Sequence, residues 1–274
     1  MNRTQLLAID PQNDFCDLPQ SFWPTPDQGP ALPVAGAHED MQRLAAWIAR
    51  QGSRLDAISI TLDSHQAYDI AHPAFWRQAD GSAVPPFTQI SAAQVRAGHY
   101  VPRDARELQP GLAYLDALQA QGRYQLMVWP LHCEVGSWGH CVHADVLAAC
   151  RRWQEQDLRT VHHVFKGMNP RTEHYSAICA EVPDPEDSST DINQELLARL
   201  RASETLVIAG EASSHCVLAT TEHILQHWDG DKARLVLLTD CMSPVAGFED
   251  DHARFLQRMR ELGVRCETST SFNI

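Results

Sequence analysis

A single stretch, residues 206–228, limits the folds open to this chain more than any other. Residues 206–209 are apolar, include β-branched side chains and end at Gly210, which is typical of a buried strand. The side chains that follow recur at the helical spacing of three and four residues, at Val217, Leu218, Thr221, Ile224, Leu225 and Trp228. The stretch therefore predicts a strand, a short loop and a helix, with Cys216 where the helix begins.

Cys216 is a candidate nucleophile because of this position. The free backbone N–H groups and the macrodipole at a helix N-terminus favour an anion, so we expect the thiol to ionise more readily than a free cysteine, whose pKa is about 8.5. The same N–H groups can hold a developing oxyanion. The alternative is a buried cysteine that packs as a small apolar side chain, and the stretch by itself favours this alternative.

Composition restricts the partners and the compartment. The 274 residues suit a single α/β domain, and the excess of 35 acidic over 22 basic residues argues against nucleic acid and anionic membranes, which leaves a small molecule as the expected ligand. The N-terminus has no apolar run long enough for a signal peptide, and no run could span a bilayer, so we expect a soluble, cytoplasmic protein. The eight cysteines are scattered, which is typical of reduced thiols.

Strands and helices are predicted to alternate along the chain. A strand at residues 5–9 ends at Asp10, apolar residues at helical spacing follow between Met41 and Ile48 and stop at Gly52, and a second strand at 55–62 ends at Asp63. Such βαβ units build parallel sheets with helices on both faces. Further strands are predicted at 125–129, 160–165, 234–239 and 264–266, and further helices at 104–121, 142–153, 192–202 and 248–262. Ser189, Thr190 and Asp191 are the candidate caps of the 192–202 helix.

One long segment interrupts this pattern. From Gln66 to about Arg103 the sequence loses periodicity and collects prolines and glycines. A structureless segment of this size inside a compact domain is more often functional than idle. We therefore predict a single domain over residues 1–274, with an insertion at about 66–128 that rims the active site.

Several reactive side chains follow the predicted strands directly. They are Asp10, Asp63, His65, Lys166 and Cys216. Ligands of doubly wound sheets bind outside the carboxyl ends of the strands, so these side chains should meet at one edge. A thiol nucleophile needs a base and a positive charge, which Asp10 and Lys166 can supply. Lys166 is one of only two lysines, with Lys232. A solvated surface lysine and a turn aspartate are the alternatives.

The residues around these positions resemble a known family. The segments AIDPQNDF around Asp10, VFKG and KGMNPRTEHYSA at Lys166, and GEASSHCV around Cys216 are similar to those of isochorismatase-like cysteine hydrolases, most of all nicotinamidases. The resemblance implies a three-layer α/β/α fold with a six-stranded, mainly parallel sheet, and Asp10, Lys166 and Cys216 as a catalytic triad. It also implies a cis peptide between Glu211 and Ala212 and an oxyanion hole formed by the backbone N–H groups of Ala212 and Cys216.

A metal site is implied by two further motifs, Asp63-Ser64-His65 and WPLHC at residues 129–133. By resemblance, Asp63, His65 and His132 hold one divalent ion, for which Zn²⁺ is expected and Fe²⁺ or Mn²⁺ are alternatives. In nicotinamidases this ion binds the pyridine nitrogen. His72 is nearer to His65 in sequence, but it matches no ligand of the family, so we do not expect it to take part.

The resemblance also suggests a substrate pocket. Phe15 and Trp129 match positions that bracket a flat ring, although ordinary core aromatics are an alternative. His162 and His163 lie in a predicted central strand and are interpreted as core or interface groups.

Departures from the family pattern affect the substrate more than the reaction. Ser64 stands where nicotinamidases commonly have tryptophan, and residues 213–215 are Ser-Ser-His instead of Thr-Asp-Tyr. The sequence predicts a metal-dependent amidohydrolase that converts nicotinamide to nicotinate and ammonia through a Cys216 thioester. Alternatives are a related hydrolase of N-carbamoyl compounds, ureido compounds or isochorismate, and a non-catalytic metal-binding scaffold. A small-molecule amide is the expected partner, and homo-oligomerisation is left open.

Overall fold

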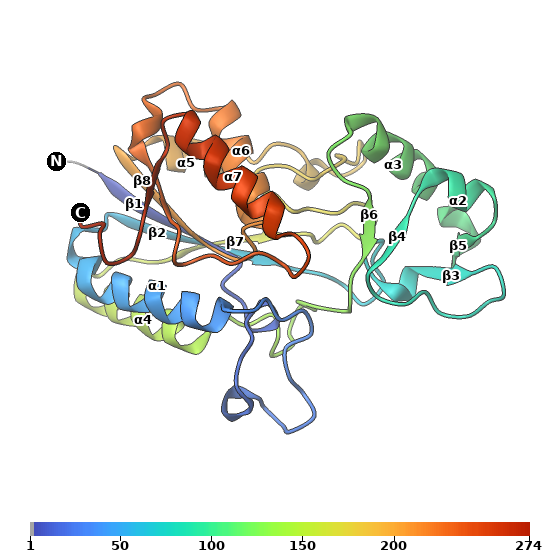
Figure 1. Cartoon of the computed structure of the whole chain (residues 1–274), viewed down its shortest axis with the longest axis horizontal. Helices are drawn as coiled ribbons and strands as arrows, with labels where there is room; N and C mark the ends of the chain where they lie inside the picture. Colours follow the sequence, from blue (N-terminus) through green and yellow to red (C-terminus); the bar gives the residue numbers. More distant parts are fainter. Residues whose placement is uncertain (1–2) are drawn as a thin grey trace.

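A sheet of six parallel strands runs through the protein (Figure 1) and confirms the predicted fold class. The computed structural model describes residues 3–274. The strand order is β10 (Arg265–Glu267), β9 (Leu235–Leu238), β8 (Thr205–Gly210), β1 (Thr4–Ile9), β2 (Ala57–Asp63) and β7 (His162–Lys166). The central strand β1 is buried at every residue, as expected for a sheet covered on both faces.

Helices cover the two faces of this sheet (Figure 1). On one face lie α1 (Ala37–Gln51) and α4 (Ala144–Asp157), and on the other α5 (Gln194–Arg201), α6 (Cys216–Gln226) and α7 (Glu249–Glu261). In α1 the predicted apolar stripe, which includes Met41, Leu44 and Ile48, is buried. Within residues 3–274, no helix combines the length and apolarity that crossing a bilayer requires.

The register of the sheet brings the predicted site residues together. Asp63 at the end of β2 pairs with Lys166 at the end of β7, and Ile9 at the end of β1 pairs with Gly210 at the end of β8. Gly210 has φ +122°, and a Cβ atom there would lie 1.9 Å from the Ile9 carbonyl oxygen. Only glycine therefore fits between β1 and the loop that leads to Cys216.

The insertion is more ordered than its sequence indicates. It contains β3 (Trp76–Gln78), β4 (Thr88–Ile90), α2 (Ala92–Arg96), β5 (Tyr100–Pro102), α3 (Leu108–Gln121) and β6 (Leu126–Val128). Strands β3 and β5 pair antiparallel, as do β4 and β6, and a separate apolar core includes Phe75, Trp76 and Leu118. The prediction that residues 66–103 lack regular structure was wrong, because three-residue strands are too short to show a period. The strand predicted at 125–129 exists as β6, but it pairs with β4 and stays outside the main sheet.

Two helix ends also differ from the predictions. Asn193 caps α5, since its Oδ1 accepts a hydrogen bond of 2.9 Å from Leu196 N, whereas residues 188–190 form a separate 3₁₀ turn. Gly52 does not end α1 in the left-handed conformation: it has φ −51° and continues into a 3₁₀ turn. At each of these helix ends, the predicted and the observed arrangement satisfy the same unpaired backbone groups. The sequence pattern therefore did not distinguish one from the other.

The strand with the two adjacent histidines was placed wrongly. It is β7, which lies at the edge of the sheet instead of its centre. His163 is exposed and His162 is half-buried. The alternating exposure of β7 is typical of a strand with one face open to water, and strand order is not visible in the sequence.

We predict that Gly210→Ala lowers the free energy of unfolding by about 3 kcal/mol or more, because it adds both steric overlap with β1 and backbone strain. Urea denaturation would measure this loss. Gly81→Ala is the matched control, since Gly81 has φ +86° but open space around its Cα, so it carries the strain alone. Equal losses for the two variants would contradict the prediction.

Candidate active site

The structure brings Asp10, Lys166 and Cys216 into contact at the carboxyl edge of the sheet. Lys166 Nζ lies 2.9 Å from Asp10 Oδ2 and 3.5 Å from Cys216 Sγ. All three side chains are buried, although their positions are far apart in the sequence. The three residues come from the ends of β1 and β7 and from the first position of α6.

Asp10 is held in one orientation by Thr61 on the neighbouring strand. Thr61 Oγ1 donates to Asp10 Oδ1 at 2.5 Å, and Asp10 N donates to the Thr61 carbonyl at 3.2 Å. Burial raises the pKa of the Asp10 carboxyl group above its usual value, against the opposing charge of Lys166. Oδ2 is therefore an oriented proton acceptor directed at the lysine and the thiol.

Lys166 carries a buried positive charge. Its Nζ lies 2.9 Å from Asp63 Oδ1, in addition to Asp10, and donates to the His174 carbonyl at 2.9 Å. Burial alone lowers the pKa of Lys166, but Asp10 and Asp63 outweigh it and raise the pKa well above the usual value. The ammonium group therefore stays charged and can stabilise a neighbouring thiolate.

The expectation of a readily ionised thiol was wrong. Burial raises the pKa of Cys216 well above the usual value, and Asp10 and Asp63 add to this effect, while Lys166 opposes it. The helix start is closed off from water in the folded chain, which the sequence did not reveal. A protonated resting thiol needs a base, and Asp10 is the carboxylate beside it.

The loop before Cys216 presents two backbone donors. The peptide between Glu211 and Ala212 is cis, as the resemblance implies. Among the hydrogen bonds of residues 3–274, none uses the N–H of Ala212 or of Cys216. Both residues line the same pocket, so their N–H groups are available to a ligand there.

Asp63, His65 and His132 form a cluster of convergent acceptors. Asp63 Oδ2 lies 3.1 Å from His65 Nε2 and 3.4 Å from His132 Nε2. The Nδ1 atoms face acceptors outside the cluster, namely Asp69 Oδ2 at 3.1 Å and the Pro130 carbonyl at 2.9 Å. Burial lowers the pKa of His65, but the charges of Asp63 and Asp69 outweigh it and raise the pKa well above the usual value. When the hydrogen sits on Nδ1, the Nε2 lone pairs of the two rings face the Asp63 carboxylate. A cation can take the place of the Nε2 hydrogen between these atoms, and the donor set fits a divalent transition metal.

His72 lies in the same cluster, contrary to the expectation that it takes no part. It is completely buried, and its Nε2 is 3.2 Å from His132 Nδ1. Its Nδ1 lies 3.2 Å from the Gln66 carbonyl, and burial lowers the pKa of His72 to about 2, so the ring is neutral and its Nε2 lone pair faces His132 Nδ1. One nitrogen each of His65, His72 and His132 lies within 4.8 Å of the others. The path of the chain through the insertion brings His72 there.

A narrow pocket connects these groups. Its walls include the predicted aromatics Phe15 and Trp129 together with Cys216. Phe15 meets the His132 ring edge-on at 5.5 Å, and Trp129 Nε1 donates to the Tyr175 hydroxyl at 3.2 Å. Sequence reasoning gave no role to four further lining residues, which are Leu32, Glu173, His215 and Val245, and Tyr175 lines the pocket as well. Several of them stand inside the quoted motifs, which was the only signal available.

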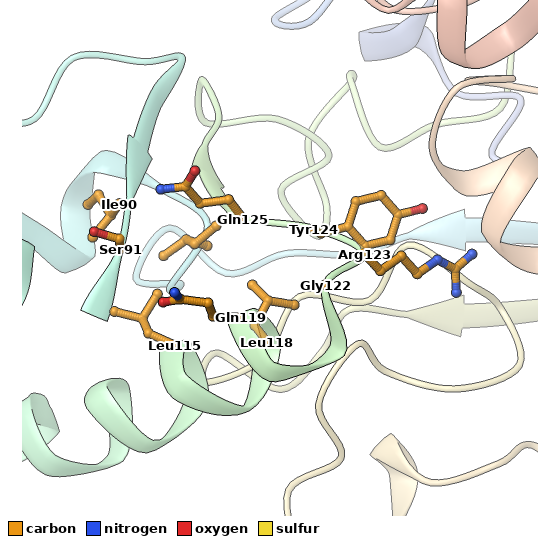
Figure 2. A pocket seen from close by; sticks show the side chains of 10 residues that line it. Ile90, Ser91, Leu115, Leu118, Gln119, Gly122, Arg123, Tyr124 and Gln125 are labelled. Carbon is orange, nitrogen blue, oxygen red and sulfur yellow. The ribbon is translucent and has the colours of Figure 1, made fainter. Parts of the chain in front are cut away.

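A wider hollow, with a volume of about 420 Å³, adjoins the pocket. The two share Trp129, Tyr175 and His215, and the insertion supplies Gln89 and Met127 to the outer wall. Figure 2 shows another hollow, inside the insertion, whose lining is drawn from β4, α3 and the segment before β6. The lining of that hollow includes no cysteine, histidine or carboxylate, so the narrow pocket is the candidate active site.

Comparison with known proteins supports this architecture. No protein-family model and no curated protein matches the sequence. Among solved structures, the Acinetobacter baumanii nicotinamidase and pyrazinamidase has a TM-score of 0.63 at 18% identity, over 98% of both chains. The zinc complex of Pyrococcus horikoshii pyrazinamidase has 0.54 at 17% identity, over 97% of this chain and 99% of that one. An isochorismatase family protein from Desulfovibrio vulgaris has 0.53 at 16% identity, over 98% and 96%.

The chain has the isochorismatase-like fold. The matches extend over nearly the whole of each chain, including the long insertion. At these identities the likeness concerns the fold, and the chemistry of the site has to be argued from the residues themselves.

We predict that the purified protein binds about one divalent ion per chain and that His132→Ala loses most of it, because an acceptor of the cluster is removed. Elemental analysis after dialysis against Zn²⁺ would measure the content. His163→Ala, on the exposed edge strand, is the control. Equal metal contents in His132→Ala and the wild type would contradict the assignment.

Proposed function

We propose that this protein is a metal-dependent cysteine amidohydrolase and that its substrate is nicotinamide, which it converts to nicotinate and ammonia. The observation that carries the proposal is the contact of Lys166 Nζ with both Asp10 Oδ2, at 2.9 Å, and Cys216 Sγ, at 3.5 Å. This arrangement combines a base, a fixed positive charge and a nucleophile beside two unused N–H donors.

The first half of the reaction forms a thioester. Asp10 takes the thiol proton as Cys216 Sγ attacks the carboxamide carbon, and a C–S bond forms. The carbonyl oxygen becomes an oxyanion held by the N–H groups of Ala212 and Cys216. Asp10 then gives its proton to the amide nitrogen, the C–N bond breaks and ammonia leaves. The raised pKa of Asp10 suits this exchange, since the carboxyl group holds the proton between the two steps.

The second half releases the acid. Asp10 takes a proton from a water molecule that attacks the thioester carbon, and the C–S bond breaks as the tetrahedral intermediate collapses. The proton returns to the sulfur, so the thiol is restored and nicotinate leaves. Lys166 remains charged throughout and stabilises the anionic sulfur.

The metal ion is proposed to be Zn²⁺, held by Asp63, His65 and His132 with His72 beside them. The similar Pyrococcus horikoshii pyrazinamidase was solved as a complex with zinc, and the imidazole and carboxylate donors suit the same metal. When bound, the ion supplies a Lewis acid for the ring nitrogen of the substrate. Asp63 connects this site to the triad, since Oδ1 faces Lys166 and Oδ2 faces His65.

The pocket supports a small, flat substrate. Phe15 and Trp129 line a narrow space that reaches Cys216, and aromatic walls beside the nucleophile suit a flat heteroaromatic ring with a carboxamide group. Pyrazinamide has the same shape and is the expected second substrate.

One observation favours a second candidate function. The wider hollow joins the narrow pocket at His215, in the segment where the chain departs from the family pattern. A longer amide, such as an N-carbamoyl or ureido compound, would extend into that space. A panel of amides assayed for ammonia release distinguishes the two functions by the highest kcat/KM.

Replacement of the nucleophile tests the proposal directly. We predict that Cys216→Ala lowers ammonia release from nicotinamide by at least about a thousandfold, because no thioester can form. Cys150→Ala, which removes a buried thiol of α4, should keep nearly full activity. A fully active Cys216→Ala variant would overturn the proposed function.

The acid limb of the pH profile tests the role of Asp10. The Thr61 hydroxyl lowers the pKa of Asp10 by hydrogen bonding to its ionised form, so Thr61→Val should raise that pKa further. Because the proposed base works only when deprotonated, the acid limb of kcat/KM should move to higher pH. Thr221→Val is the control, since the buried Thr221 hydroxyl has no hydrogen-bond partner in residues 3–274. An unmoved acid limb in Thr61→Val would argue against Asp10 as the base.

A further inference from the structure

A buried carboxyl group stands directly beside the proposed oxyanion hole. Glu211 precedes Ala212 and is completely inaccessible to solvent. Its backbone N–H donates to the Ile9 carbonyl at 2.8 Å, one residue before Asp10. The peptide that leads to the Ala212 N–H is thus attached to the strand end that carries the proposed base.

The Glu211 side chain is attached to Ser243, which lies after β9. Ser243 N donates to Glu211 Oε2 at 3.0 Å, and the Ser243 carbonyl accepts from Ser213 N at 2.9 Å. Ser243 Oγ donates to Asp40 Oδ2 at 2.5 Å. Ser243 therefore holds Glu211 and Ser213, the two residues that flank Ala212, and connects both to α1.

No cation contacts Glu211 in the described part of the chain. Arg43 Nη2 lies 2.5 Å from Asp40 Oδ1 instead, and Glu211 Oε1 is buried without any donor. Ser243 connects the two carboxyl groups, since its N–H donates to Glu211 Oε2 and its Oγ donates to Asp40 Oδ2. The titratable and charged groups around the pair are Asp40 and Arg43 of α1, Cys16 and Asp17 of the N-terminal loop, Cys241 after β9, and His252 of α7.

These surroundings decide which member of the pair is ionised. Burial raises the pKa of Glu211 well above its usual value, and the charge of Asp40 adds to this. Burial raises the pKa of Asp40 as well, but Ser243 and Arg43 donate to its carboxylate and lower that pKa, so Asp40 is the member of the pair that carries the negative charge. Two buried carboxylates connected through Ser243 would repel each other, whereas a neutral Glu211 beside Asp40 would not.

We propose that Glu211 is a positioning residue for the hydrolysis: as a neutral acid bound to Ser243, which also holds Asp40, it fixes the Ala212 N–H where the oxyanion forms. This inference rests on the proposed function. When Glu211 loses its proton, the repulsion from Asp40 displaces the peptide beside Ala212, and turnover falls. The family resemblance assigns no such role to this position.

Two substitutions of Glu211 separate positioning from simple packing. Glu211→Gln has the shape of the neutral acid and cannot ionise, while Glu211→Leu removes the polar contacts. For nicotinamide, Glu211→Leu should lower kcat by about tenfold or more and change KM by less than about threefold. Glu211→Gln should keep kcat within about threefold at neutral pH and should retain it at alkaline pH where the wild type declines.

A second measurement, inhibition by an aldehyde, tests the oxyanion hole without turnover. The Cys216 thiol should add to the carbonyl group of pyridine-3-carbaldehyde, the aldehyde analogue of nicotinamide. In this addition the S–C bond forms and the thiol proton moves to the carbonyl oxygen. That oxygen occupies the oxyanion position. Glu211→Leu should weaken this inhibition by about the same factor as kcat, and Glu211→Gln should not.

The outcomes distinguish this inference from the proposed function. A Glu211→Gln profile that superimposes on the wild type at every pH would overturn the inference. So would a Glu211→Leu variant that loses thermal stability while kcat and aldehyde inhibition stay unchanged. If Glu211→Leu does not fold, the pH profile of Glu211→Gln decides alone. Wild-type protein that releases no ammonia from any amide refutes the proposed function first, and the inference falls with it.

Discussion

The buried ammonium group of Lys166 is the interaction on which the rest of the site depends. An isolated charge in the protein interior costs several kcal/mol, so it persists only with well-placed partners. Asp10 and Asp63 supply them at 2.9 Å each, from the ends of two neighbouring strands. Removal of either carboxylate would leave an uncompensated charge, which makes the ends of β1, β2 and β7 one electrostatic unit.

The two carboxylates differ in role because their surroundings differ. Burial raises the pKa of Asp63, but Lys166 and His65 outweigh it and lower the pKa well below the usual value. The pKa of Asp10 is raised, since burial exceeds the effect of the same lysine. Asp63 therefore stays ionised, which suits its proposed role as a metal ligand, while Asp10, the proposed base, can gain and lose a proton. The same residue type is thus suited to two different roles on either side of one ammonium group.

The sequence predicted the parts of this arrangement that depend on strand ends. Asp10, Asp63 and Lys166 each follow an apolar run, and parallel strands bring such positions to one edge. The ionisation of Cys216 and the position of His72 were not predictable in the same way. Both depend on how the loops pack over the sheet. This packing determines the burial of the two side chains, and it produces no periodic pattern in the sequence. The order inside residues 66–103 was missed for a similar reason, because its strands have three residues each.

The insertion leaves the main domain immediately after His65 and returns to it just before His132. An ion coordinated by both histidines would cross-link the base of this lobe and close the long loop between them. Loop closure of this kind removes conformational entropy from the unfolded chain, and an ion that binds only the folded pair stabilises it by mass action. The same metal would then stabilise the position of the insertion as well as bind the substrate. Chelation should therefore loosen the outer wall of the wider hollow.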